Sequence, residues 1–158
     1  MDDNEVKDIM FKEVDLIQGV INRMASNSFM IKGWSLTVAG IAYSLNLSFG
    51  KVWILGVGIT LLCFLFWFLD TFFLRTERKY RALYNDVVSK YNKKKYKEIK
   101  WFNLNTKDYE FDPSVGSFKK AMFSKTLLPF YLCLILISVL ITLGTIFIGS
   151  GSASGGNQ

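Results

Sequence analysis

The chain has 158 residues, a formal net charge of +6, 51% hydrophobic residues and 20% charged residues. This length suits one domain. There is no histidine, and no nucleophile motif, phosphate-binding loop or carboxylate pair is present, so the usual parts of an enzyme are missing. We therefore expect no catalytic site, no metal and no cofactor. The two cysteines, Cys63 and Cys133, lie in apolar segments and are interpreted as packing residues.

The first 32 residues predict an amphipathic helix on the cytoplasmic side of a membrane. Its apolar residues recur at helical spacing: Val6, Met10, Ile17, Val20, Ile21 and Met24. The acidic start of the chain suits the positive end of a helix dipole and differs from a signal peptide, which starts with basic residues. The polar face is mixed rather than lysine-rich, so docking on another helix is favoured over lying on lipid.

Residues 33–74 predict a hairpin of two transmembrane helices. Residues 52–69 are 18 residues without charge, close to the roughly 20 that a helix needs to cross the bilayer. The segment before them is more mixed, and Gly50 and Lys51 form the turn. Its small and polar residues are expected to face other helices: Ser35, Thr37, Gly40, Ser44 and Asn46. A re-entrant or interfacial helix is the alternative for this segment.

Two charged residues mark the inner ends of this hairpin. Lys32 precedes the first span and Asp70 follows the second. Antiparallel helices bring these ends together, so we predict a Lys32–Asp70 ion pair. A carboxylate in hydrocarbon is costly and usually faces protein or water. The pair is interpreted as structural, with a conducting or gating role as the alternative.

Residues 75–125 predict a basic cytoplasmic segment made of a helical stalk and a loop. An apolar stripe with nearly heptad spacing runs out of the second span: Leu69, Phe73, Thr76, Tyr80, Leu83, Val87 and Tyr91. This stripe needs a cover, which is either the amino-terminal helix or a neighbouring subunit.

A basic loop follows the stalk beside Trp101 and Phe102. It consists of Lys93, Lys94, Lys95, Lys97 and Lys100. Near a membrane, each lysine contributes about 1 kcal/mol of attraction to an anionic leaflet. Three interpretations stay open: retention of positive charge in the cytoplasm, a lipid surface, or a surface for a cytoplasmic partner protein. Nucleic acid uses the same charges and rings but is the least favoured ligand.

Residues 126–149 predict the third transmembrane helix. Residues 126–148 are 23 residues without charge, and Pro129 falls in the first turn or two. Residues 150–158 are rich in glycine and serine. They predict a flexible tail that is typical of an engineered linker.

Positive charge predicts the topology, because lysine and arginine stay on the cytoplasmic side. They number 4 before the first span, 1 in the outer turn, 14 between the second and third spans, and 0 after the third. Three spans then place the amino terminus in the cytoplasm and the carboxyl terminus on the periplasmic or external side of a bacterial inner membrane.

Three blocks of the sequence carry a family resemblance: "LIQGVINRMASNSFMIKGWSLTVAG", "FWFLDTFFLRTERKYRALYNDV" and "SFKKAMFSKTLLPFY". They resemble blocks of a widespread group of small bacterial membrane proteins, some of which occur with anti-phage systems. The chain is also similar to SLATT-type effectors, in which a two-span hairpin precedes a cytoplasmic helix. The resemblance covers residues 16–137, and the predicted third span departs from the two-span pattern.

The sequence thus predicts an all-α membrane protein with three transmembrane helices, an amphipathic amino-terminal helix and a cytoplasmic helical stalk. We expect a homo-oligomer. The resemblance implies an effector or accessory of anti-phage defence that perturbs the membrane or forms a pore, together with a cytoplasmic defence partner. A membrane anchor that recruits a partner through the basic loop is one alternative. A subunit of a small-solute channel or transporter is the other.

Overall fold

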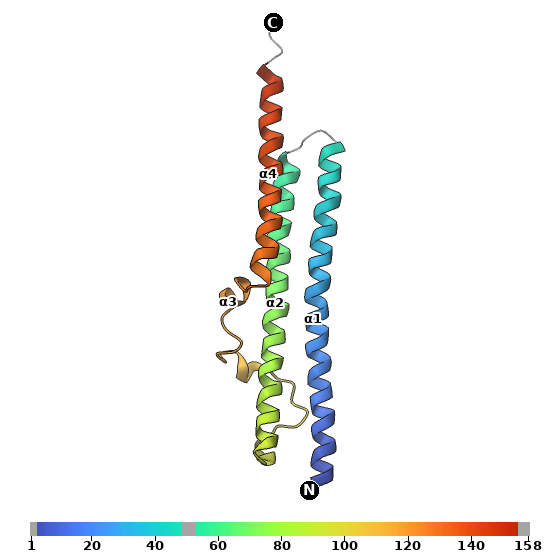
Figure 1. Ribbon diagram of the computed structural model, residues 1–158, viewed down its shortest axis with the longest axis vertical. Helices are drawn as coiled ribbons and strands as arrows, with labels where there is room; N and C mark the ends of the chain where they lie inside the picture. Colours follow the sequence, from blue (N-terminus) through green and yellow to red (C-terminus); the bar gives the residue numbers. More distant parts are fainter. Residues whose placement is uncertain (1–2, 49–52, 155–158) are drawn as a thin grey trace. The chain divides into compact units, whose positions relative to one another are not determined.

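The computed structural model describes residues 3–48 and 53–154. Most of these residues are helical, and they contain no strand. The elements are α1 (Asp3–Ser48), α2 (Trp53–Asn92), η1 (Tyr96–Glu98), η2 (Lys107–Tyr109), α3 (Phe118–Met122) and α4 (Leu127–Ser154) (Figure 1). The chain divides into two compact units. Of the described residues, 3–28 and 71–121 form the charged unit, and 29–48, 53–70 and 122–154 form the apolar unit.

Helix α1 contains both the predicted amphipathic helix and the first predicted span in one continuous helix. It contains no proline and its one glycine near the junction, Gly33, does not interrupt it. A single glycine costs a helix interior only about 1 kcal/mol relative to alanine. Residues 3–28 of α1 belong to the charged unit and residues 29–48 to the apolar unit.

The core of the charged unit forms where the amino-terminal part of α1 packs on the second half of α2. Its buried residues are Met10, Ile17 and Ile21 from α1, Leu83 and Val87 from α2, and Ile99 from the following loop. The predicted docking of the amino-terminal helix on this part of α2 is therefore confirmed. The cover for the apolar stripe comes from the same chain.

The stripe itself is shorter than the sequence predicts. Tyr80 and Tyr91 pack against the buried pair Leu83 and Val87. Leu69, the first predicted member, is 37% exposed and does not belong to this core, and Phe73 is half-buried. The reason is that Leu69 lies in the apolar unit, where large apolar side chains face outward.

Helix α2 ends in a Schellman motif. The N–H of Lys95 donates to the carbonyl of Lys90, and that of Lys94 donates to the carbonyl of Tyr91. Lys94 takes the left-handed conformation that this motif requires, with φ of 56°. This turn sends the chain back along the charged unit through the basic loop.

The apolar unit is built from parts of α1, α2 and α4, with small side chains at their contacts. Ala39 of α1 packs against Ile59 and Cys63 of α2, and Leu134 and Ile135 of α4 cover them. Small residues allow close helix approach, which is typical of packing inside membranes. The large residues are left for the outer surface.

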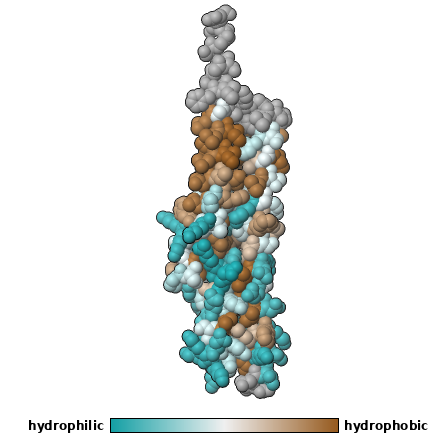
Figure 2. Space-filling model, viewed as in Figure 1, coloured by the Kyte–Doolittle hydropathy of each residue, from teal (hydrophilic) through white to brown (hydrophobic). Residues whose placement is uncertain are grey.

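The outer surface of the apolar unit consists of large hydrophobic side chains, as Figure 2 shows for one face. Leu61 of α2 is 65% exposed and Leu140 of α4 is 68% exposed. Only 28% of the most apolar stretch of α2 and 17% of that of α4 are buried. The core helix of a soluble protein would be mostly buried, so this surface is better matched by lipid.

Helix α2 and the Leu127–Gly144 part of α4 are long and apolar enough to cross a membrane. No other helix among the described residues meets both conditions. Residues 33–48 of α1 fall short because Ser35, Thr37 and Tyr43 dilute their apolar content. The predicted outer turn at Gly50 and Lys51 lies outside the described residues.

Helix α4 continues to Ser154 and so includes residues 150–154 of the predicted tail. Each glycine there weakens the helix by only about 1 kcal/mol, and α4 carries the helix into this segment from a long apolar run. Residues 155–158 lie outside the described part of the chain.

The contact between α2 and α4 yields a packing prediction. A Cβ at Gly56 would overlap the Thr142 side chain, whereas nothing lies within 4 Å of a Cβ at Gly58. Gly56→Ala should therefore lower the free energy of unfolding by about 1–3 kcal/mol. Gly58→Ala, the matched control, should be neutral or stabilising. Thermal unfolding in detergent, followed by circular dichroism, measures both, and equal effects would contradict the close approach.

Candidate functional site

The strongest candidate site is a buried cluster in the apolar unit, made by one residue from each of its helices. Lys32 Nζ of α1 lies 2.6 Å from Asp70 Oδ2 of α2. The hydroxyl of Tyr131 on α4 donates to the same oxygen at 3.1 Å. Asp70 and Tyr131 have no exposed surface, and the Lys32 side chain is 24% exposed. The ion pair that the sequence predicts is thus present, with a third partner.

The surroundings of the cluster hold Tyr131 in place. The ring of Trp67 stacks on that of Tyr131, with centroids 6.0 Å apart. The Trp67 Nε1–H donates to the carbonyl of Met122 at 3.0 Å, near the start of α4. Pro129 occupies the first turn of α4, where a missing N–H costs nothing. Asp70 lies one turn after Trp67, so the same face of α2 presents both residues.

The sequence did not predict Tyr131 as a site residue. A signal was available, because "LLPFYLC" places a tyrosine one turn into the third apolar run, at the same end as Lys32 and Asp70. Buried tyrosine hydroxyls usually find a polar partner. The only carboxylate within the apolar runs is at Asp70, which makes it the natural acceptor.

The cluster is electrically neutral and links three helices through one carboxylate. Removing a charge from water costs several kcal/mol, and only a close partner with further hydrogen bonds compensates. Loss of either charge would leave the other buried beside apolar helices. Such an arrangement is stable when intact and sensitive to any change that separates the helices.

A second polar layer lies further along the same helices. The hydroxyls of Thr60 on α2 and Ser138 on α4 lie 2.7 Å apart. The hydroxyl of Tyr43 on α1 is buried and interacts with the Ser138 side chain, but not with the geometry of an ordinary hydrogen bond. Ala39 and Cys63 belong to the apolar contact of the same bundle. The interior therefore contains two polar layers together with an apolar contact.

The predicted polar face of α1 divides between two sides of the helix. Ser35 is buried, whereas Thr37, Gly40 and Ser44 are exposed. Residues two positions apart on a helix point in directions about 200° apart, so Ser35 and Thr37 cannot share a face. The side chain of Asn46 lies outside the described residues.

The exposed hydroxyls of α1 are satisfied inside the helix. Thr37 donates to the carbonyl of Gly33 at 3.0 Å, and Ser44 donates to that of Gly40 at 2.9 Å. Such back-bonding is common for serine and threonine in helices. These hydroxyls therefore do not need a partner helix to satisfy their hydrogen bonds.

The basic loop lies on the surface of the charged unit. All five predicted lysines are exposed: Lys93, Lys94, Lys95, Lys97 and Lys100. Lys95 pairs with Glu98 at 2.9 Å, and Lys100 lies 3.6 Å from Asp108. Both pairs are largely solvent-exposed and contribute little to stability. The charge of the loop therefore faces outward and contributes little to the stability of the fold.

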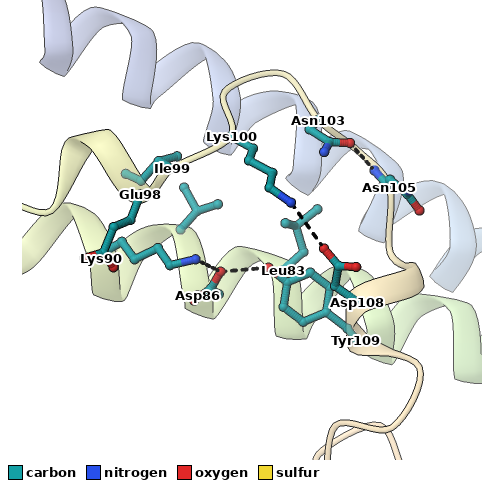
Figure 3. A pocket seen from close by; sticks show the side chains of 11 residues that line it. Leu83, Asp86, Lys90, Glu98, Ile99, Lys100, Asn103, Asn105, Asp108 and Tyr109 are labelled. Carbon is teal, nitrogen blue, oxygen red and sulfur yellow. Dashed lines mark hydrogen bonds and ion pairs between the residues drawn. The ribbon is translucent and has the colours of Figure 1, made fainter.

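A polar pocket of about 80 Å³ lies beneath this loop (Figure 3). Asp86 accepts hydrogen bonds from Lys90 at 2.6 Å and from Tyr109 at 2.7 Å. Partial burial acts to raise the pKa of Asp86, but these hydrogen bonds and the Lys90 charge lower that pKa below its ordinary value. Burial and the bond to Asp86 raise the pKa of Tyr109. The network fastens η2 to α2.

Glu13 fastens the loop to α1. Its side chain has no exposed surface, and Oε2 accepts the backbone N–H of Phe102 at 2.6 Å. Phe102 has a φ of 59°, which is unusual for a bulky residue. Glu13 Oε1 finds no hydrogen-bond partner in the described part of the chain. The sequence places Glu13 on an amphipathic helix and gives no sign of this contact.

Searches against protein-family models, curated proteins and solved structures found no match to this chain.

The cluster predicts strong coupling between its charges. Lys32→Met should lower the free energy of unfolding by about 3–5 kcal/mol, because Asp70 stays buried without its counter-ion. The double variant Lys32→Met with Asp70→Leu should lose less than Lys32→Met alone. Arg23→Met, which removes an exposed cation from the same helix, is the control. Denaturant unfolding in detergent micelles measures these values, and purely additive effects would contradict the coupling.

The Asp86 network predicts a pH dependence of the charged unit. The folded pKa of Asp86 lies below its unfolded value of about 4, so its contribution is present above that pH and is lost as the pH falls. The raised pKa of Tyr109 has the opposite sign, so its contribution is lost above about pH 10. Asp86→Asn should flatten the acid side of the stability profile, and Tyr109→Phe the alkaline side.

Thermal unfolding from pH 3 to 11 checks both changes. At neutral pH, Asp86→Asn should cost about 1–3 kcal/mol, because a charge-assisted hydrogen bond is weakened. Asp8→Asn changes an exposed carboxylate on α1 and serves as the control. An Asp86→Asn profile with the parental acid slope would show that another group governs it.

Proposed function

We propose that the chain is an oligomeric protein of the bacterial inner membrane that perturbs ion permeability as an effector of anti-phage defence. The observation that carries the proposal is the Lys32–Asp70–Tyr131 cluster, buried inside a unit whose outer surface is apolar. Placing an ionisable residue among membrane helices costs free energy, so such a residue is a candidate functional site. The defence context rests on the family resemblance.

The position of α1 supports a third membrane span in this proposal. Ala39 packs on Ile59 and Cys63, and Lys32 pairs with Asp70, so residues 29–48 share one bundle with α2 and α4. This part of α1 also exposes large apolar side chains: Trp34, Leu36, Ile41 and Leu45. A helix with these contacts on one side and apolar residues on the other belongs in the same lipid layer as its neighbours.

The exposed face of α1 supports self-association. Gly33, Thr37, Gly40 and Ser44 are spaced 4, 3 and 4 residues apart, and all four are exposed. Small residues at such spacing let a second helix approach closely in a membrane. The stripe of the charged unit offers no such support, since α1 covers it within the same chain.

The cluster supplies a switch in this proposal. While Lys32, Asp70 and Tyr131 remain in contact, three helices are fastened at one point. A partner or ligand that separates them must stabilise the exposed charges, and water can do so only if it enters the bundle. Opening of the helices and entry of water would therefore occur together, and an oligomer of such bundles would leak ions.

A membrane anchor is the second candidate, and the exposed basic loop favours it. Lys93, Lys94 and Lys97 make no ion pair with described residues, so their charge is available to a partner protein or to the anionic leaflet. In this case the cluster has only a structural role, and the chain would not change membrane permeability.

The three-span topology predicts opposite locations for two surface cysteines. In a background with Cys63→Ala and Cys133→Ala, Lys97→Cys should react with an impermeant maleimide only after the cells are permeabilised. A cysteine placed after Gln158 should react in intact cells. Labelling of both positions on the same side would remove α1 from the set of spans.

The proposed activity predicts depolarisation that depends on the ion pair. Cells that express the chain with its neighbouring genes, with and without phage, are followed with a membrane-potential dye. Lys32→Met and Asp70→Asn should each depolarise cells more than the parental chain. The charge swap, Lys32→Asp with Asp70→Lys, should return the signal toward the parental value, and Lys97→Met should not change it.

Membrane-inserted protein is quantified for each variant, so that loss of signal through degradation is recognised. If equal amounts of inserted protein leave the potential unchanged in every case, and the purified chain is monomeric, the anchor replaces the effector.

A further inference from the structure

The loop of residues 110–117 in the charged unit is fastened to α2 by a row of basic side chains. Arg75 lies 2.6 Å from Glu110 Oε1, and Lys79 pairs with the other carboxylate oxygen. Arg78 donates to the carbonyl of Val115, whose side chain is completely buried. The position of the loop is therefore set by contacts on both sides of Phe111.

Phe111 nevertheless projects away from the protein. Its side chain is 94% exposed, more than any other large hydrophobic side chain in the described part of the chain. Leaving such a ring in water forfeits about 1.5–3 kcal/mol relative to burying it. A ring that a fastened loop presents in this way is typical of a contact surface, and an apolar environment would recover the lost free energy.

A cleft of about 500 Å³ opens beside this ring, and its polar groups carry both signs of charge. Arg75 and Glu110 largely compensate each other. Asp112 Oδ1 accepts both hydrogen bonds from Ser114, which leaves Oδ2 for another donor. The exposed Lys120 side chain passes over Gly116 at the other end of the loop. The cleft therefore offers one carboxylate oxygen and one ammonium group beside a phenyl ring.

Residues that line this cleft lie close to the apolar runs along the chain. Arg75 is the first cation after the charge-free part of α2, and Lys120 precedes the apolar run of α4 by a few residues. Cations at these positions are typical of the level of lipid headgroups. This step rests on the proposed membrane topology.

We propose that the cleft binds the headgroup of a phospholipid that carries both a phosphate and a primary ammonium, as in phosphatidylethanolamine. Lys120 contacts the phosphate, Asp112 accepts the ammonium, and Phe111 enters the boundary between headgroups and acyl chains. Aromatic and apolar side chains in that layer anchor proteins at the membrane surface. No covalent step is involved.

The charges of the cleft favour this class of lipid over the alternatives. The carboxylate of Asp112, which has no cationic partner among the described residues, would repel a headgroup with net negative charge. A quaternary ammonium has no N–H to donate to Asp112, so it loses a charge-assisted hydrogen bond. Hydrogen bonds from Ser114 lower the pKa of Asp112, which keeps this carboxylate ionised at neutral pH.

The first test asks whether Phe111 contacts lipid. The full chain, free of native cysteines, receives an environment-sensitive fluorophore at Phe111→Cys, Leu140→Cys or Lys97→Cys and is placed in nanodiscs that contain spin-labelled lipids. A label near the headgroups should quench position 111, a label in mid-chain should quench position 140, and neither should quench position 97. Quenching at 140 without quenching at 111 overturns the inference alone. Absence of quenching at 140 overturns the membrane topology itself.

The second test asks which headgroup is bound. Delipidated protein in detergent is titrated with phosphatidylethanolamine, phosphatidylcholine or phosphatidylglycerol, and the thermal midpoint is recorded. Phosphatidylethanolamine should raise the midpoint most, Asp112→Asn should abolish its advantage over phosphatidylcholine, and Lys120→Met should weaken the response to both. Lys97→Met is the matched control and should behave as the parental chain. Equal responses to the three lipids, or an advantage that survives in Asp112→Asn, overturns the proposed recognition.

Discussion

A carboxylate without exposed surface must be neutralised where it stands, and Asp70 sets this requirement for the apolar unit. Lys32 supplies the charge and Tyr131 the hydrogen bond, so each helix of the unit contributes one group. Desolvation makes the ion pair costly to form. Removing only one of its charges costs more, because the other charge then stays buried without a partner. One carboxylate oxygen thus joins α1, α2 and α4, and the small residues of the same unit pack in the register that this contact fixes.

The distribution of large and small side chains follows from the same constraint. Gly56, Ala39 and Cys63 lie at helix contacts, whereas leucine and phenylalanine cover the outside. In water this arrangement would be unstable, because the hydrophobic effect rewards the burial of large groups. In lipid the large groups lose nothing outside, and close helix approach provides the packing energy. The charged unit shows the opposite arrangement, with isoleucine, leucine and valine inside.

Periodicity and charge spacing were sufficient to predict the helices, the docking of the amino-terminal helix and the Lys32–Asp70 contact, because these depend on residues close in sequence or on antiparallel geometry. The contacts of Tyr131 with Asp70 and of Glu13 with the Phe102 backbone were missed, because each joins segments whose relative placement no local pattern records. Ser35 is buried as predicted, but Thr37, Gly40 and Ser44 were wrongly grouped on the same face, because the grouping used polarity without the direction of each residue on the helix.

The internal hydrogen bonds of Thr37 and Ser44 have a consequence for assembly. A helix face whose hydroxyls are already satisfied leaves no polar group stranded when two copies separate, so dissociation carries no hydrogen-bond penalty. Association through such a face is governed by mass action and by the number of copies per unit area of membrane. If the proposed self-association occurs through this face, a modest rise in synthesis or local clustering would be enough to populate the assembled form.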